Sequence, residues 1–136
     1  MSSSTEQSAA TPRAIVAGHG EFASGLISAV EQITGRGSQL VAVSVARLSV
    51  QDIETLLREK MVEHGVHVIF TDLQAGSCTM ASRRILRGMS DAVLVAGANL
   101  PTILDFVFAD DKAAPDAARH AAERGRAAIS VHGAGA

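Results

Sequence analysis

The sequence contains no tryptophan and no tyrosine, and only four of its 136 residues are phenylalanine. Aromatic platforms on which nucleic-acid bases could stack are therefore not expected. The net charge is −2 and no cluster of basic residues stands out, so binding to nucleic acid is not expected either. The single cysteine, Cys78, excludes an intrachain disulfide, which is typical of a protein in a reducing compartment.

Long apolar segments are also missing. No run approaches the roughly 18 apolar residues of a membrane span, and no basic region followed by an apolar core marks a secretory signal. We therefore expect a cytoplasmic protein that does not insert into a membrane. Hydrophobic residues still make up 47% of the chain and charged residues 19%, which is typical of a globular protein.

The length of the chain predicts one domain with two polar ends. Residues 1–12 are rich in serine, threonine, glutamine and alanine, and have too little apolar surface to pack, so they are predicted to be a disordered tail. Residues 13–132 are expected to form a single α/β domain, and residues 133–136 a flexible end.

Short apolar runs alternate with segments of helical periodicity. The pattern predicts strands over 13–17, 40–46, 66–71 and 92–96, and helices over 22–33, 49–64, 77–86, from 101 and over 116–127. Strands that are apolar on both faces predict an open parallel sheet of four strands with helices on both faces. The expected strand order is 2-1-3-4, in which the first and third strands are neighbours. Residues 129–132 allow one further short edge strand.

Polar residues follow the first and third predicted strands. His19 stands between Gly18 and Gly20 after the first strand, and Asp72 follows the third. Because the carboxyl ends of parallel strands meet at one edge, His19 and Asp72 are expected to face each other where the strand order reverses. A carboxylate beside one imidazole nitrogen fixes the tautomer and leaves the other nitrogen free as a nucleophile.

The residues around this pair suit a bulky anion. Gly18 and Gly20 are expected to leave space beside the ring. Gly76 and Ser77, at the start of a predicted helix, offer backbone N–H groups and a hydroxyl to an anion. Together these residues predict a histidine that carries a phosphoryl group, without a metal or another cofactor.

Four segments resemble the IIA component of the mannose class of bacterial sugar phosphotransferase systems, which also covers fructose, sorbose and N-acetylgalactosamine systems. These segments lie at 15–20, 70–77, 81–85 and 97–101, and read Ile-Val-Ala-Gly-His-Gly, Phe-Thr-Asp-Leu-Gln-Ala-Gly-Ser, Ala-Ser-Arg-Arg-Ile and Gly-Ala-Asn-Leu-Pro. The resemblance covers residues 14–128. Members commonly have a glycine pair and Ser-Pro after the aspartate, whereas residues 74–78 here read Gln-Ala-Gly-Ser-Cys.

The resemblance implies roles for these residues. His19 would accept a phosphoryl group from the histidine phosphocarrier protein and pass it to a IIB component, while Asp72 orients the ring. Gly20, Gly76 and Ser77 would lie around the phosphoryl group. The resemblance also implies a four-stranded parallel sheet, no metal, no cofactor and often a homodimer formed through a C-terminal extension.

Three other interpretations remain open from the sequence. Residues 18–23 also fit the dinucleotide fingerprint G-x-G-x-x-A, although no acidic residue follows the second strand to bind a ribose. Cys78, at a predicted helix start, could act with His19 and Asp72 as a cysteine hydrolase. A non-catalytic regulatory module of the same fold would not need His19.

Overall fold

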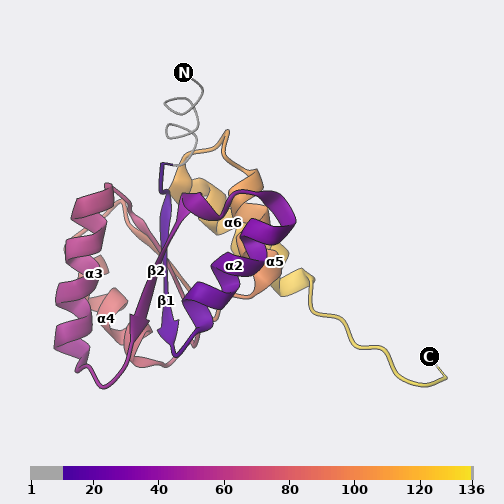
Figure 1. The fold of residues 1–136 in the computed structure, drawn as a ribbon, viewed down its shortest axis with the longest axis horizontal. Helices are drawn as coiled ribbons and strands as arrows, with labels where there is room; N and C mark the ends of the chain where they lie inside the picture. Colours follow the sequence, from indigo (N-terminus) through magenta and orange to yellow (C-terminus); the bar gives the residue numbers. More distant parts are fainter. Residues whose placement is uncertain (1–10, 136) are drawn as a thin grey trace.

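The structure, a computed structural model, describes residues 11–135 (Figure 1). The tail predicted over 1–12 lies almost entirely outside the described residues. The strands are β1 (Ala14–His19), β2 (Leu40–Val45), β3 (Val68–Thr71) and β4 (Val93–Ala96). The helices are α2 (Phe22–Thr34), the short 3-10 helix η1 (Gly37–Gln39), α3 (Val50–His64), α4 (Ser77–Leu86), α5 (Leu100–Phe108) and α6 (Ala114–Ala127).

The four strands form one parallel sheet in the order β2-β1-β3-β4, which confirms the predicted fold class. The chain moves outward from β1 to β2 and then returns to place β3 on the other side of β1. The carboxyl ends of the neighbouring strands β1 and β3 therefore lie on either side of the reversal, where α/β proteins of this kind place their ligands.

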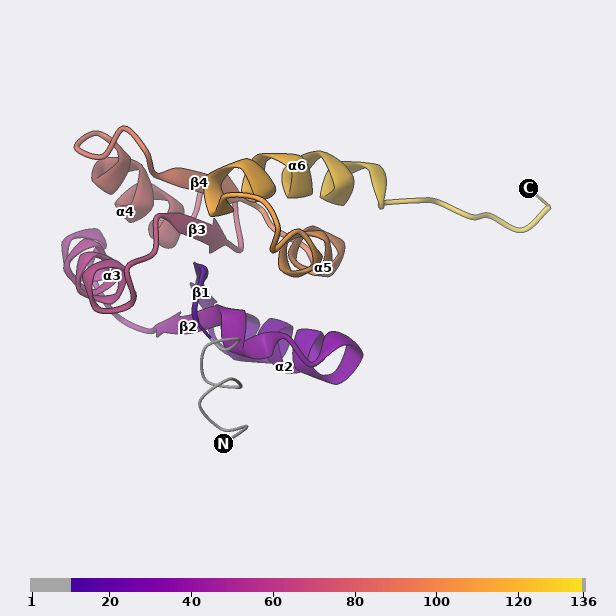
Figure 2. The ribbon, with the colours of Figure 1, turned by 90° about the horizontal axis from the view of Figure 1, so that it is seen from above.

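Helices cover both faces of the sheet (Figure 2). Helices α3 and α4 pack on one face, and α2, α5 and α6 on the other. Successive side chains of β1 point to opposite faces, so Val16 joins the core under α2, α5 and α6 while Ile15 joins the core under α3 and α4. This alternation explains why every residue from Ala14 to Ala17 is fully buried.

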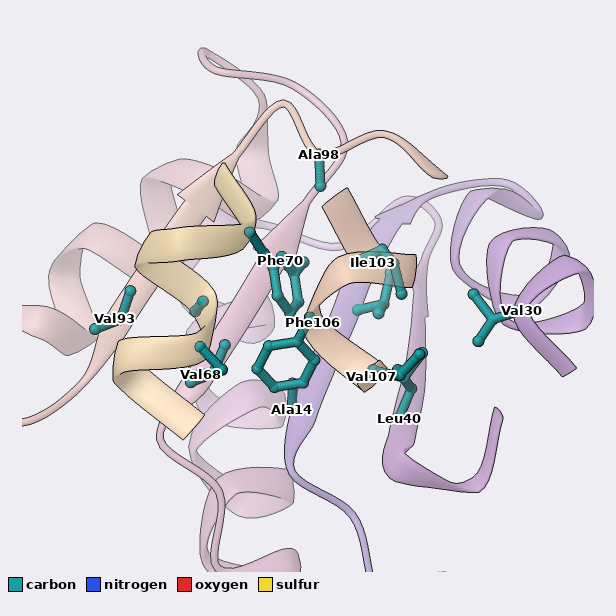
Figure 3. Packing of buried hydrophobic residues seen from close by; sticks show 14 of the residues in the cluster. Ala14, Val30, Leu40, Val68, Phe70, Val93, Ala98, Ile103, Phe106 and Val107 are labelled. Carbon is teal, nitrogen blue, oxygen red and sulfur yellow. The ribbon is translucent and has the colours of Figure 1, made fainter. Parts of the chain in front are cut away.

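The core under α5 and α6 contains most of the aromatic side chains (Figure 3). The rings of Phe70 on β3 and Phe106 on α5 meet edge to face, with centroids 5.0 Å apart. Helix α6 also approaches α5 closely at Gly125, whose carbonyl accepts a hydrogen bond of 3.1 Å from the side chain of Asn99. Helices α5 and α6 therefore pack together on this face of the sheet and cover its core.

The short edge strand that the sequence allowed over 129–132 is wrong. These residues lack strand pairing, and the chain runs away from the sheet after α6 (Figures 1 and 2). Ile129 and Val131 are 73% and 93% exposed. An edge strand needs backbone pairing with β4, and residues 129–132 form no strand in the sheet.

None of the helices in the described part of the chain has the length and apolar character that a membrane crossing requires.

Candidate functional site

The proposed site residues lie where β1 and β3 end. His19 is the last residue of β1 and pairs in register with Val45 of β2. Ala17 pairs with Thr71, the last residue of β3, so Asp72 emerges beside His19 at the same edge of the sheet. The parallel register thus brings together two residues that are 53 positions apart in the sequence.

One carboxylate oxygen holds both the ring and the backbone of the histidine. The Oδ2 atom of Asp72 lies 2.8 Å from Nδ1 of His19 and accepts a hydrogen bond of 2.9 Å from its backbone N–H. The carboxylate is an acceptor, so Nδ1 carries the proton and Nε2 keeps its lone pair. The His19 side chain is 56% exposed, and Nε2 makes no hydrogen bond with the described residues.

The environment of Asp72 favours its charged form. Burial alone would raise the pKa of this carboxyl, since only 10% of its side chain is exposed. The hydrogen bonds from the backbone and ring of His19, together with the positive charge of that ring when it is protonated, outweigh burial and lower the pKa below its ordinary value. The other oxygen, Oδ1, is buried and has no hydrogen-bond partner among residues 11–135. Asp72 is therefore an ionised acceptor directed at the histidine.

Gly18 allows the carboxylate to approach β1. A Cβ atom at this position would lie 2.7 Å from Cδ2 of Phe22 and 2.9 Å from Oδ2 of Asp72. The sequence interpretation, in which Gly18 leaves space for a bulky group beside the ring, therefore needs correction. The missing Cβ makes room for Asp72 itself.

The other predicted anion-binding residues surround the ring in different ways. Gly20 follows the histidine with a left-handed φ of 52°, and its carbonyl accepts a hydrogen bond of 2.7 Å from Ser44. A Cβ atom at Gly76 would lie 3.6 Å from Cε1 of His19, so this glycine borders the ring. Ser77 opens α4, which has no side-chain cap, and its hydroxyl makes no hydrogen bond with the described residues. The first N–H groups of α4 thus remain without side-chain partners beside the histidine.

Two buried threonines also support this site, and no pattern in the sequence indicates their role. The hydroxyl of Thr79 donates to the carbonyl oxygen of Leu73 and lies 2.6 Å from the hydroxyl of Thr71. A threonine in the first turn of a predicted helix is typical of a cap, and nothing local indicates that it reaches back six residues. Its partners become visible only when β3 and α4 are packed together.

Cys78 does not have the properties of a nucleophile. The side chain belongs to α4 and is fully buried in the core that this helix shares with α3. Burial, followed by the nearby charge of Asp72, raises the pKa of its thiol to about 11. A reactive cysteine needs an exposed thiol that ionises near neutral pH. The cysteine-hydrolase interpretation therefore lacks support, and Cys78 packs as a small apolar residue.

A second histidine–aspartate pair joins α5 and α6. Nδ1 of His120 lies 2.8 Å from Oδ2 of Asp105, the same separation as in the first pair. This pair lies on helix surfaces, and Arg124 also contacts the carboxylate, with Nε 3.7 Å from Oδ1. It provides a comparison within the same chain, because the two atoms are equally close but both residues lie within helices and not at strand ends.

The loop after β1 differs from a dinucleotide site in its charge. The backbone N–H of His19, which a pyrophosphate would need, is already bound by the Asp72 carboxylate. A second carboxylate, Glu21, stands at the N-cap of α2. A pyrophosphate bound at the start of α2, as the dinucleotide fingerprint requires, would meet both carboxylates. Within residues 11–135, His, Cys, Asp and Glu side chains form no group of three that could hold a metal ion.

The fold and the strand-end pair define a class: open α/β proteins with an exposed histidine, oriented by a carboxylate, at the reversal of the strand order. The model of the family described as PTS system fructose IIA component, where PTS is the phosphotransferase system, matches residues 13–123. The chain therefore belongs to this family, and the resemblance to mannose-class IIA components is confirmed.

Solved structures show the same fold. The chain is similar to the phosphotransferase system component EIIA from Streptococcus agalactiae, with 21% identity, a TM-score of 0.76 and coverage of 88% of this chain and 95% of that chain. It is also similar to the mannose/sorbose specific IIA subunit from Enterococcus faecalis, with 19% identity, a TM-score of 0.77 and coverage of 90% and 96%. No curated protein matches the chain.

Proposed function

We propose that the protein is a phosphoryl carrier in which His19 accepts a phosphoryl group from the histidine phosphocarrier protein and passes it to a IIB component. One observation carries this proposal: Asp72 holds Nδ1 of an exposed His19 side chain and leaves Nε2 without a hydrogen bond to the residues that the structure describes. A neutral imidazole fixed in this way presents a lone pair to an incoming phosphorus atom. Membership of the IIA family supports the same chemistry.

The transfer exchanges one phosphorus–nitrogen bond for another. The lone pair on Nε2 attacks the phosphorus of the donor's phosphohistidine, and the donor nitrogen leaves with the electron pair of the broken bond. His19 keeps its proton on Nδ1, so its ring becomes positively charged when the new bond forms. The Asp72 carboxylate, 2.8 Å from Nδ1, stabilises that charge. Transfer to the IIB component reverses these steps, and neither step requires a metal or a nucleotide.

Gly20, Gly76 and Ser77 are the residues that we propose around the phosphoryl oxygens. Gly76 borders the ring without filling the space beside it. The uncapped start of α4 and the unbound hydroxyl of Ser77 offer donors to negative oxygens. Gly20 follows the histidine in a backbone conformation that other residues rarely adopt.

The surface around His19 suits protein partners. Leu73 and Met80, near the start of α4, are 55% and 53% exposed, so apolar side chains lie on the surface beside an open histidine.

A homodimer stays a prediction. The free edge of β4 and the exposed Ile129 support it, and we expect sedimentation equilibrium to give twice the mass of one chain. The mass of a single chain at all concentrations would contradict it.

The decisive experiment is phosphorylation by the general phosphotransferase proteins with labelled phosphoenolpyruvate. The label is expected to be acid-labile and base-stable, as for phosphohistidine, and peptide mapping should locate it on His19. His120 serves as an internal control because its Nδ1 is held by a carboxylate at the same distance. Absence of label, or label on any residue other than His19, would exclude the proposed function.

A further inference from the structure

The loop between β3 and α4 carries most of the groups assigned to phosphoryl transfer. Asp72 opens it, and Gly76 and Ser77 close it. Helix α4 begins at this loop without a side-chain cap, so the usual anchor of a helix start is missing. A loop that must hold a carboxylate within hydrogen-bond distance of a ring needs another anchor.

Thr79 and Thr71 supply that anchor through a directed pair of hydrogen bonds. A hydroxyl has one proton, and Thr79 donates it to the carbonyl of Leu73. The bond of 2.6 Å between the two hydroxyls is therefore donated by Thr71 and accepted by Thr79. Thr71 and Thr79 are 0% and 2% exposed, so water does not compete for either hydroxyl.

The anchored carbonyl belongs to the residue directly after Asp72. The backbone of Thr71, directly before Asp72, is also fixed, because its carbonyl accepts hydrogen bonds from the N–H groups of Gly97 and Ala98 at 3.0 and 2.8 Å. Asp72 is thus held on both sides along the chain. On one side the anchor is the backbone after β4, and on the other it is a side-chain hydroxyl of α4.

We propose that Thr79 is a positioning residue for the phosphoryl-accepting site. This inference rests on the proposed function. The hydroxyl of Thr79 fixes the Leu73 carbonyl, and through it the direction in which the Asp72 carboxylate reaches His19. Without that hydroxyl, the Leu73 carbonyl loses its donor and the Thr71 hydroxyl loses its acceptor. The loop then relaxes, and Oδ2 no longer holds both the ring and the backbone of His19.

The first test is the rate of phosphorylation by phosphoramidate, a small donor that needs no docking surface. Nε2 attacks its phosphorus, the phosphorus–nitrogen bond breaks, and the amine takes a proton and leaves as ammonia. Thr79→Val, which keeps the shape but removes the hydroxyl, is expected to slow labelling of His19 about tenfold. Thr79→Ser restores the hydroxyl and should bring the rate back to within about twofold of the original protein.

Ser82→Ala is the matched control. Ser82 is also buried in α4, and its hydroxyl donates to the Cys78 carbonyl at 2.7 Å, one turn further from the site. Its removal should leave the labelling rate unchanged although a buried hydrogen bond is lost. Equal slowing in Ser82→Ala and Thr79→Val would mean that Thr79 acts only on the stability of α4, and would overturn the proposal.

The second test is the pKa of the Asp72 carboxyl, followed by nuclear magnetic resonance. Hydrogen bonds from His19 help to lower this pKa, so Thr79→Val should raise it and Ser82→Ala should not. If Thr79→Val does not fold, Thr71→Val, which leaves the bond to Leu73 intact, should give a smaller rise. An unchanged pKa overturns the proposal.

The two tests separate the two hypotheses. The titration needs no phosphorylation, so a raised Asp72 pKa in Thr79→Val without labelling of the original protein would reject the proposed function and retain the orienting role of Thr79. Normal labelling of the original protein with no change of rate or pKa in Thr79→Val would reject the positioning role and retain the function.

Discussion

Replacing Asp72 by asparagine is expected to slow phosphorylation of His19 by about a hundredfold. If the amide oxygen takes the place of Oδ2, the tautomer is kept, but the positive ring that forms during transfer loses its counter-charge. If the amide NH₂ turns toward the ring instead, Nδ1 becomes an acceptor and the proton moves to Nε2, which blocks the nucleophile. Both outcomes slow transfer, and single-turnover labelling with phosphoramidate measures the effect.

Asp105→Asn is the matched control for this variant. Asp105 holds His120 at the same distance of 2.8 Å, so the substitution removes an equivalent carboxylate from an equivalent histidine at another place on the chain. The rate of labelling should stay that of the original protein. Equal rates in Asp72→Asn and the original protein would show that the carboxylate does not take part.

The same substitution also has an expected signature in stability. The pKa of Asp72 is lowered in the folded protein, so its carboxylate stabilises the fold above the ordinary carboxyl pKa of about 3.9. That contribution is lost as the pH falls from this value through the lowered folded value. Urea unfolding should therefore separate Asp72→Asn from the original protein at pH 7, and the difference should shrink in acid.

Replacing Gly125 by alanine is expected to lower the free energy of unfolding by about 2 to 3 kcal/mol, because the contact with α5 has no room for a side chain. A Cβ atom at this position would lie 1.8 Å from Oγ1 of Thr102 and 2.9 Å from Oδ1 of Asn99. Both atoms belong to the start of α5, where Asn99 caps the helix through the N–H of Thr102. The two helices must separate, and the cap bond and the bond from Asn99 to the Gly125 carbonyl are disturbed together.

Gly25→Ala is the matched control for Gly125→Ala, because it adds the same side chain at a helical glycine that has free space around it. Gly25 lies within α2, and a Cβ atom there would meet nothing within 4 Å. Alanine favours a helix over glycine by about 1 kcal/mol, so this substitution should raise stability. Thermal or urea unfolding of the two variants should give changes of opposite sign. A stabilised Gly125→Ala would mean that α5 and α6 do not approach each other as closely as described.

The sequence predicted the features that depend on local pattern. The fully apolar runs around Ile15 and Ile69, separated by helical segments, indicated parallel strands. The pairing of His19 with Asp72 was predictable because parallel strands align their carboxyl ends. These inferences need only the period of a strand and the geometry of a sheet.

Features that depend on contacts between distant segments were not predictable in this way. Nothing in the local pattern around Gly125 indicates that this residue allows α6 to pack against Asn99 and Thr102. The role of Thr79 depends on how α4 lies over β3. The composition of residues 129–132 allowed a short strand, but composition does not say whether the segment pairs with a neighbouring strand.

The shared oxygen of Asp72 has a consequence for entropy. Because Oδ2 binds both the main-chain N–H and the ring of one residue, the two side-chain torsions of His19 are fixed before any partner arrives. An exposed histidine that rotated freely would have to lose that freedom in each encounter, at a cost in rate. Here the ordering takes place once, when β1 and β3 come together, and it serves every later turnover. The rotational freedom of the His19 ring is therefore lost during folding and does not have to be lost again when a partner binds.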